Sequence, residues 1–128
     1  TSPFSSITAS AAKAVADGND IYILAEDIRS ANILKYDGSD WKNLGECASG
    51  SSGIKTSIAA YDGTSYVLIA DYSSGQGRTI LKKYNNGVWQ QVAVIEGYTA
   101  NAPALGVAGG SLYALIDNNG KSANRRSN

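Results

Sequence analysis

The sequence predicts an all-β fold made of repeated four-stranded antiparallel sheets, on three observations. An apolar phrase occurs three times, as VADGNDIYILAE (residues 15–26), AYDGTSYVLIAD (60–71) and VAGGSLYALID (107–117). A second phrase, in which four turn-type residues separate a Tyr from a Trp, occurs at 36–41 and 84–89. No stretch has helical periodicity. A repeat of about 45 residues indicates units that cover one another's apolar faces.

The first half of each unit is expected to be a tight hairpin. Its first strand is small and apolar, at about 11–16, 54–61 and 102–108. The turn that follows contains Asp-Gly or Gly-Gly, which favours a hairpin because such turns need positive φ. An ungapped alignment of the three copies superposes three turn glycines, Gly18, Gly63 and Gly109. The second strand (21–25, 66–70 and 112–116) is apolar on both faces, which is typical of a strand between two sheets.

The second half of a unit is predicted to be another hairpin. Its third strand lies at 32–36 or 79–84, and its fourth begins at Trp41 or Trp89. Tyr36 and Trp41, like Tyr84 and Trp89, are expected to face each other across the turn. Since both tryptophans recur at the same repeat position, packing between units is favoured over stacking on a sugar.

Four-stranded antiparallel units of about 45 residues are typical of β-propeller blades. We expect one domain, 1–128, with a first blade at about 11–46, a second at about 54–96 and a partial third at about 102–117. Residues 4–8 are a candidate outer strand for that third blade, and 118–128 is expected to be a polar tail. The chain then holds about two and a half to three blades, whereas closed propellers have about four to eight. The exposed blade faces require a cover, either the remaining blades of a longer chain or self-association of two copies into a closed six-bladed ring.

These repeats resemble the kelch-like propeller repeats. The resemblance is an apolar strand followed by a Tyr, a short turn and a Trp. The first copy has the apolar segment 21–23 with the Tyr–Trp pair at 36 and 41, and the second has 68–69 with the pair at 84 and 89. Kelch repeats carry Gly-Gly at the end of the apolar strand, where this chain has Ala25-Glu26. The phrase Tyr-Asp-Gly-Ser-x-Trp is similar to blade repeats of bacterial secreted and surface proteins. The resemblance implies a recognition module located outside the cell or on its surface.

Composition and charge exclude several classes of protein. Eleven basic residues balance eleven acidic ones, so no basic field exists for nucleic acid. No apolar run approaches the roughly 20 residues of a membrane helix, so no membrane insertion is expected. The chain has no His and one cysteine, Cys47, so neither a metal site nor a cofactor is expected. The lack of His also removes the commonest general base.

Candidate ligand-binding residues lie where the second strands end. The alignment superposes three acids there, and a propeller would bring them to one rim; carboxylates accept sugar hydroxyls, and an Arg fork binds acidic groups. A simpler interpretation is that acids at strand ends are solvated and form turns. With two loop arginines and one loop tyrosine, the candidates are Glu26, Asp71, Asp117, Arg29, Arg78 and Tyr72.

The expected function is therefore recognition or scaffolding without catalysis. The ligand would be a glycan or a protein partner, bound on a propeller face. The alternative is a fragment of a propeller-fold glycoside hydrolase of the sialidase kind, which would need paired carboxylates or an Arg cluster with a Tyr nucleophile.

Overall fold

The structure, a computed structural model, describes residues 9–50, 53–72, 77–96, 103–118 and 121–127. For residues 95–96, 115–118 and 121–127 it describes the backbone alone. These segments form eleven β-strands. Nothing in them is a helix long and apolar enough to span a membrane. The fold is all-β, as predicted.

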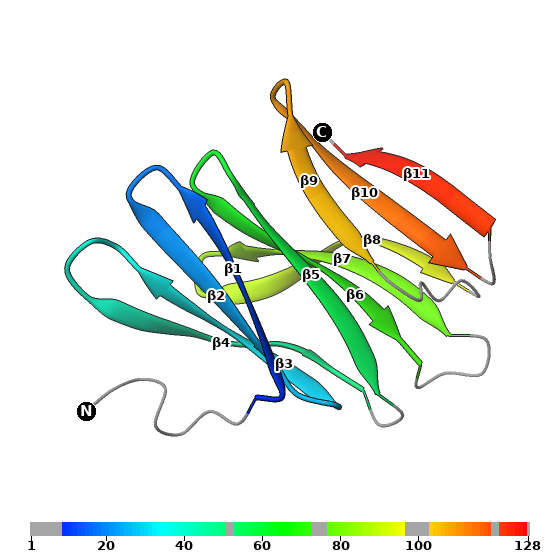
Figure 1. Cartoon of the computed structure of the whole chain (residues 1–128), viewed down its shortest axis with the longest axis horizontal. Helices are drawn as coiled ribbons and strands as arrows, with labels where there is room; N and C mark the ends of the chain where they lie inside the picture. The colour runs from blue at the N-terminus through cyan, green and yellow to red at the C-terminus, as the bar shows by residue number, and fades with distance from the viewer. Residues whose placement is uncertain (1–8, 51–52, 73–76, 97–102, 119–120, 128) are drawn as a thin grey trace.

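The strands form three antiparallel meanders of the propeller-blade type (Figure 1). Blade 1 consists, in this spatial order, of β1 (Ala11–Asp17), β2 (Asp20–Glu26), β3 (Ser30–Tyr36) and β4 (Trp41–Ser49). Blade 2 repeats the order with β5 (Ile54–Tyr61), β6 (Thr64–Asp71), β7 (Arg78–Asn85) and β8 (Val88–Glu96). The third sheet has three strands, β9 (Ala104–Ala108), β10 (Ser111–Asn118) and β11 (Lys121–Ser127).

The three sheets lie face to face like a partly opened fan. Their first strands, β1, β5 and β9, are neighbours in that order, and the hairpins that follow them gather at the upper edge of Figure 1. Contacts between sheets are most frequent along these first strands and fewer between the fourth strands β4 and β8. Blades that radiate from an axis have this geometry.

Two apolar cores lie between the sheets. The first joins blade 1 to blade 2 and contains Leu24 and Ile33 on one side and Val67 on the other, all with no exposed surface. The second joins blade 2 to the third sheet and contains Leu68 and Leu112. Because β6 contributes to both cores, it is apolar on both faces, as the sequence predicted. Each fully buried side chain of this size stabilises the fold by about 1.5–3 kcal/mol.

The structure corrects the alignment of the middle repeat by one residue. Counted from the tight turn, Tyr22 of β2 corresponds to Tyr66 of β6 and Tyr113 of β10. The sequence alignment instead superposed Tyr22 on Val67, which points to the opposite face. Tyr22 packs toward blade 2 and Tyr66 toward the third sheet, so the same face of each blade covers the next. The alignment of the first copy with the third was correct.

Turn chemistry explains the error. The first turn is Gly18-Asn19, with positive φ at Gly18 alone, whereas Asp62-Gly63 and Gly109-Gly110 have positive φ at both residues. The first pattern is that of a type II′ turn and the second that of a type I′ turn. Gly63 therefore occupies the second turn position, whereas Gly18 occupies the first. Matching glycines does not define the register when the turn type changes.

Hydrogen bonds between sheets support the corrected register. Asp17, the last residue of β1, accepts a hydrogen bond at Oδ2 from the Gly63 amide at 2.8 Å. Tyr61, the last residue of β5, donates its hydroxyl to the Gly110 carbonyl at 2.6 Å. Gly63 and Gly110 are both second turn residues, so the two contacts join equivalent positions, although the Gly63 amide donates and the Gly110 carbonyl accepts. One blade-to-blade geometry is thus used twice.

The Tyr–Trp hairpins form as predicted. Tyr36 pairs with Trp41 across a four-residue loop, and their ring centroids are 5.0 Å apart. Tyr84 and Trp89 pair in the same way at 5.2 Å. Trp89 also packs against the first core and donates its Nε1–H to the Leu44 carbonyl of β4 at 3.1 Å. This contact supports packing between blades as the role of Trp89.

The expected polar tail contains a strand. Residues Lys121–Ser127 form β11, which pairs with β10 from Asn118↔Lys121 to Leu112↔Ser127. The side chains of this segment are poor strand formers, but its backbone groups gain partners along the free edge of β10. Residues 4–8, the candidate outer strand, lie outside the described residues.

Candidate functional site

Glu26 lies at the blade 1–blade 2 interface and not in an open ring of acids. Its Oε1 accepts hydrogen bonds from the amide of Thr56 at 2.9 Å and from the Thr56 hydroxyl. Lys13 Nζ lies 3.5 Å from the same oxygen, and the Glu26 side chain is 12% exposed. Glu26 therefore connects the two blades, and its carboxylate is already occupied.

Asp71 is not equivalent to Glu26. In the corrected register Glu26 corresponds to Ala70, and Asp71 corresponds to Asp27. Asp71 is 4% exposed, and its Oδ2 lies 3.4 Å from Nε of Arg78, to which it is paired across β6 and β7. The predicted equivalence of Asp71 with Glu26 is therefore wrong, although Asp71 and Arg78 do lie together.

The other predicted residues are dispersed. Asp117 lies in β10 at the position equivalent to Glu26, but its side chain lies outside the described residues. Arg29 is exposed in the β2–β3 loop. Tyr72 is half-buried, and burial raises the pKa of its hydroxyl above the usual 10.0. These residues share strand ends in the sequence, but those whose side chains are described point in different directions.

Glu26 and Tyr72 meet in one hollow, which we call the loop-rim cavity. It has a volume of about 260 Å³, and its lining also includes Asp27, Ile28 and Lys55. The Glu26 carboxylate accepts a hydrogen bond from the Thr56 amide. Asp27 accepts one at Oδ1 from the Ile28 amide at 2.9 Å. Its carboxylates therefore serve local structure.

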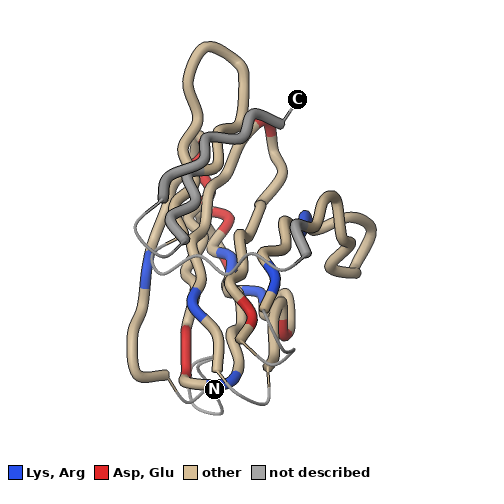
Figure 2. The backbone as a smooth tube through the Cα atoms, turned by 90° about the vertical axis from the view of Figure 1, so that its right-hand side faces the viewer, with Lys and Arg blue, Asp and Glu red and all other residues tan. Residues whose placement is uncertain are grey.

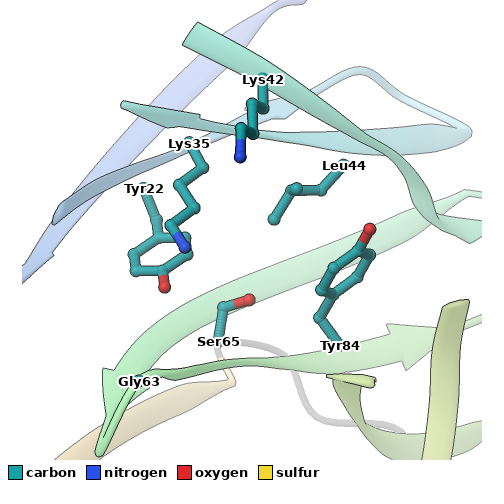
Figure 3. Close-up of a pocket in the computed structure, with 7 residues that line it drawn as sticks. All are labelled: Tyr22, Lys35, Lys42, Leu44, Gly63, Ser65 and Tyr84. Atoms are coloured by element: carbon teal, nitrogen blue, oxygen red, sulfur yellow. The ribbon is translucent and has the colours of Figure 1, made fainter. Parts of the chain in front are cut away.

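A second hollow, the inter-blade cavity, opens between blades 1 and 2 (Figure 3). Its volume is about 210 Å³. Blade 1 contributes a row of side chains from β2, β3 and β4, and blade 2 contributes a turn residue and two side chains from β6 and β7. The lining is Tyr22, Lys35, Lys42, Leu44, Gly63, Ser65 and Tyr84.

The β-sheet register creates the row on blade 1. Tyr22 pairs with Lys35, and Lys35 pairs with Lys42, so the three lie side by side on the face that blade 2 covers. Lys35 Nζ lies 5.6 Å from the centroid of the Tyr22 ring and 3.7 Å from Oδ2 of Asp20. In Figure 3 the amino groups of both lysines point toward the space between the blades.

The charge of this lining is positive. The seven residues include two lysines and no carboxylate. Elsewhere Lys and Arg are interspersed with Asp and Glu along the described chain (Figure 2). Burial raises the pKa of the Tyr22 hydroxyl, and the Lys35 ammonium partly opposes that shift. The Tyr22 phenol therefore stays neutral near pH 7 and can donate a hydrogen bond.

Ser65 provides a buried polar group without a partner. It is 2% exposed, and its Oγ is the one buried side-chain N or O atom in the described residues that forms no hydrogen bond. An unsatisfied buried hydroxyl costs about 1–3 kcal/mol. Ser65 lies on the face of β6 that covers blade 1, and its Oγ lines the inter-blade cavity.

The sequence did not predict this site, because lysines in a third strand indicate exposure while the packing of the blades is unknown. The signal was present: once Tyr36 is paired with Trp41, Lys35 must lie opposite Lys42. Like charges directly opposite on one face are unfavourable without a compensating group. Ser65 gave no such signal, since its position depends on packing between blades.

Metal and thiol chemistry find no support in the described segments. They contain no cluster of three or more His, Cys, Asp or Glu residues that could hold an ion. Cys47 is 1% exposed, and burial raises the pKa of its thiol to about 12. The Cys47 thiol is therefore protonated and unreactive at neutral pH.

The fold defines the class: this is an all-β protein of repeated, propeller-type blades. A cavity lined by two lysines lies between its first two blades. Comparison adds no family assignment: no protein-family model matches this chain, and no curated protein matches it.

Proposed function

We propose that this chain is a non-enzymatic recognition module, built of kelch-like blades of the kind found in bacterial secreted and surface proteins, that binds a glycan. The observation that supports this proposal is the inter-blade cavity, where Lys42 and Ser65 direct polar groups inward from two different blades. Ligand sites are commonly concave, with a few convergent polar groups among apolar ones. Leu44 and Tyr84 provide the apolar part of this lining.

A protein partner bound at a blade rim is the second form of this proposal. The loop-rim cavity, with Ile28 at 68% exposure beside Tyr72, favours such a contact. The hydrolase alternative is weaker, because a glycosidase needs two carboxylates placed about one bond. Glu26 and Asp71 are each occupied within the fold.

A glycan array combined with a turnover assay tests the proposal. We expect saturable binding of at least one glycan, with no free sugar released when the bound glycan is incubated with the protein and analysed by mass spectrometry. Release of sugar would show that the chain is a hydrolase. A Lys42→Met variant that keeps its thermal stability but loses binding would assign the glycan to the inter-blade cavity. If no glycan on the array binds and the chain instead captures a protein ligand, the protein-partner form of the proposal would be favoured.

We also propose that further blades cover the two outer sheet faces. Ile21, on the outer face of blade 1, is 41% exposed, and Tyr113, on the outer face of the third sheet, is 44% exposed. Tyr113 is equivalent to Tyr22 and Tyr66, which both pack on a following sheet. The cover is either part of a longer chain or a second copy in a six-bladed ring. Light scattering distinguishes them, since a dimer supports the ring and a monomer excludes it.

A secreted or cell-surface location is part of the same proposal, and the resemblance of the repeats supports it. Antibody labelling of intact cells tests it, because a surface protein is stained without permeabilisation. Staining that requires permeabilisation would contradict it.

A further inference from the structure

We propose that the inter-blade cavity binds the anionic group, a carboxylate or a sulfate, of an acidic saccharide. This inference rests on the proposed function and names the ligand class of the same site. Three features of the cavity lead to it: a pair of opposed lysines, a buried hydroxyl without a partner, and an apolar wall.

The lysine pair favours a negative group. Lys35 and Lys42 lie directly opposite each other on one face of blade 1, an arrangement that is unfavourable for two like charges. Asp20 compensates Lys35 at 3.7 Å. Lys42 is exposed, and none of the ion pairs found among the described residues includes it. An anion between the two ammonium groups would relieve the repulsion and accept their hydrogen bonds.

Apart from Asp20, which pairs with Lys35, the acids nearest the lysine pair are held elsewhere. Asp17 accepts a hydrogen bond at Oδ2 from the Gly63 amide. Asp37 is electrostatically coupled to Lys42 and Lys35, but its Oδ1 accepts the amides of Ser39 and Asp40, each at 2.9 Å. These bonds hold Asp37 in the β3–β4 turn, outside the lining. The cavity itself keeps two cations and no carboxylate.

The hydroxyl of Ser65 lacks an acceptor on the opposite wall of the same cavity. It is almost fully buried and forms no hydrogen bond, although buried hydroxyls are usually paired. Figure 3 shows its Oγ directed toward the space below Lys42 and Leu44. An anionic oxygen there would accept from Ser65 on blade 2 and from Lys42 on blade 1. The ligand would thereby connect the two blades.

Size and surface favour a saccharide over a free ion. A volume of about 210 Å³ corresponds to about seven water molecules at ~30 Å³ each, more than one carboxylate or sulfate fills. It is smaller than the ~300–1,000 Å³ typical of drug-sized ligands, so one sugar ring is the appropriate size. Leu44 and the Tyr84 ring offer apolar surface to the C–H groups of such a ring.

Calorimetric titration of the full chain at low salt and pH 7 tests the inference. The probes are glucuronic acid, glucose 6-sulfate, neutral glucose and acetate. We expect one acidic sugar to bind at least tenfold more tightly than both glucose and acetate, and to weaken as salt is raised. Comparison of the two acidic sugars shows which anion is preferred. Lys42→Met should reduce the affinity about tenfold or more, and Ser65→Ala several-fold, as expected for charge-assisted hydrogen bonds.

Lys55→Met is the matched control, since Lys55 is an exposed lysine of the loop-rim cavity. It should leave the affinity unchanged, and thermal melts establish that each variant is folded. Equal binding of glucose and the acidic sugars, or a loss of binding in Lys55→Met but not in Lys42→Met, would overturn the inference and leave glycan recognition intact. If acetate binds as tightly as the acidic sugars, the assignment of the ligand as a saccharide would be overturned. If no probe binds while the array identifies a glycan, this inference alone fails; if the array is also empty, glycan recognition fails with it.

Discussion

Replacing Glu26 with Ala should destabilise the fold, because this carboxylate links two blades. The Glu26→Ala change removes the acceptor of two Thr56 donors, and Thr56 has no exposed surface. Each unpaired buried donor costs about 1–3 kcal/mol. The Lys13 contact adds little, because the Lys13 side chain is 43% exposed and solvent screens the pair. We therefore expect a loss of about 2–4 kcal/mol, a large part of the ~5–15 kcal/mol that stabilises a typical domain.

Urea unfolding followed by tryptophan fluorescence measures this loss. Glu26→Gln keeps an acceptor oxygen and should lose about 1 kcal/mol, the difference between charged and neutral hydrogen bonds. Glu46→Ala is the matched control; Glu46 is exposed on β4, and its removal should change stability by at most about 0.5 kcal/mol.

A double-mutant cycle with Thr56→Val separates the loss of the Glu26–Thr56 hydrogen bonds from a nonspecific destabilisation of the fold. We expect a coupling free energy of about 1 kcal/mol or more between the two positions. A Glu26→Ala protein as stable as Glu46→Ala, or a coupling near zero, would refute a structural role for this carboxylate and return Glu26 to the candidate ligand residues.

Three further predictions concern other parts of the blades. The Cys47 thiol, with its pKa raised to about 12, should resist alkylation until the chain unfolds. Because the unfolded thiol ionises near pH ~8.5, stability should fall by up to about 1.4 kcal/mol per pH unit above that value. In urea titrations between about pH 8.5 and 10, below the range in which tyrosines ionise, Cys47→Ala should remove this part of the slope. Trp89→Phe removes the Nε1–H donor to Leu44 and should lose about 1 kcal/mol by the same method; unchanged stability would contradict the inter-blade bond. The turn amides of Asp40 and Ser39 lower the pKa of Asp37, so NMR should show its carboxyl group titrating below the usual ~3.9. The ionised carboxylate contributes to stability above pH ~3.9, and this contribution is lost as pH falls through the lowered pKa. The Asp37→Asn variant should lack this acid-dependent part of the stability.

Local patterns made much of the fold predictable. The alternation of side-chain character in β8, the apolar run of β6 and the Tyr36–Trp41 hairpin each depend on residues close together in the sequence. Short-range sterics and hydrogen bonding decide such features, so they could be derived before any packing was known. The strand at Lys121–Ser127 escaped prediction because the free edge of β10 provides its pairing partners, and its own side chains do not indicate a strand.

The candidate site was harder to predict, because a functional side chain is placed by the sheet on which it lies. A one-residue slip exchanges the two faces of a strand, and the middle repeat slipped by one residue in the sequence alignment. The slip superposed Asp71 on Glu26, whereas the register makes Ala70 the residue equivalent to Glu26. The same slip hid the correspondence of Tyr22 and Tyr66.

The sequence by itself determined that this protein is a repeat of antiparallel hairpins, since turn residues and apolar alternation act over a few positions. The tertiary structure alone decided which face each strand shows to its neighbour. That choice is made when sheets pack: burying Val67 against blade 1 turns Ser65 the same way, and covering Tyr22 brings Lys35 and Lys42 to the opposite wall. The cavity exists because two surfaces distant in the chain must exclude water together, a condition that no single stretch of sequence records.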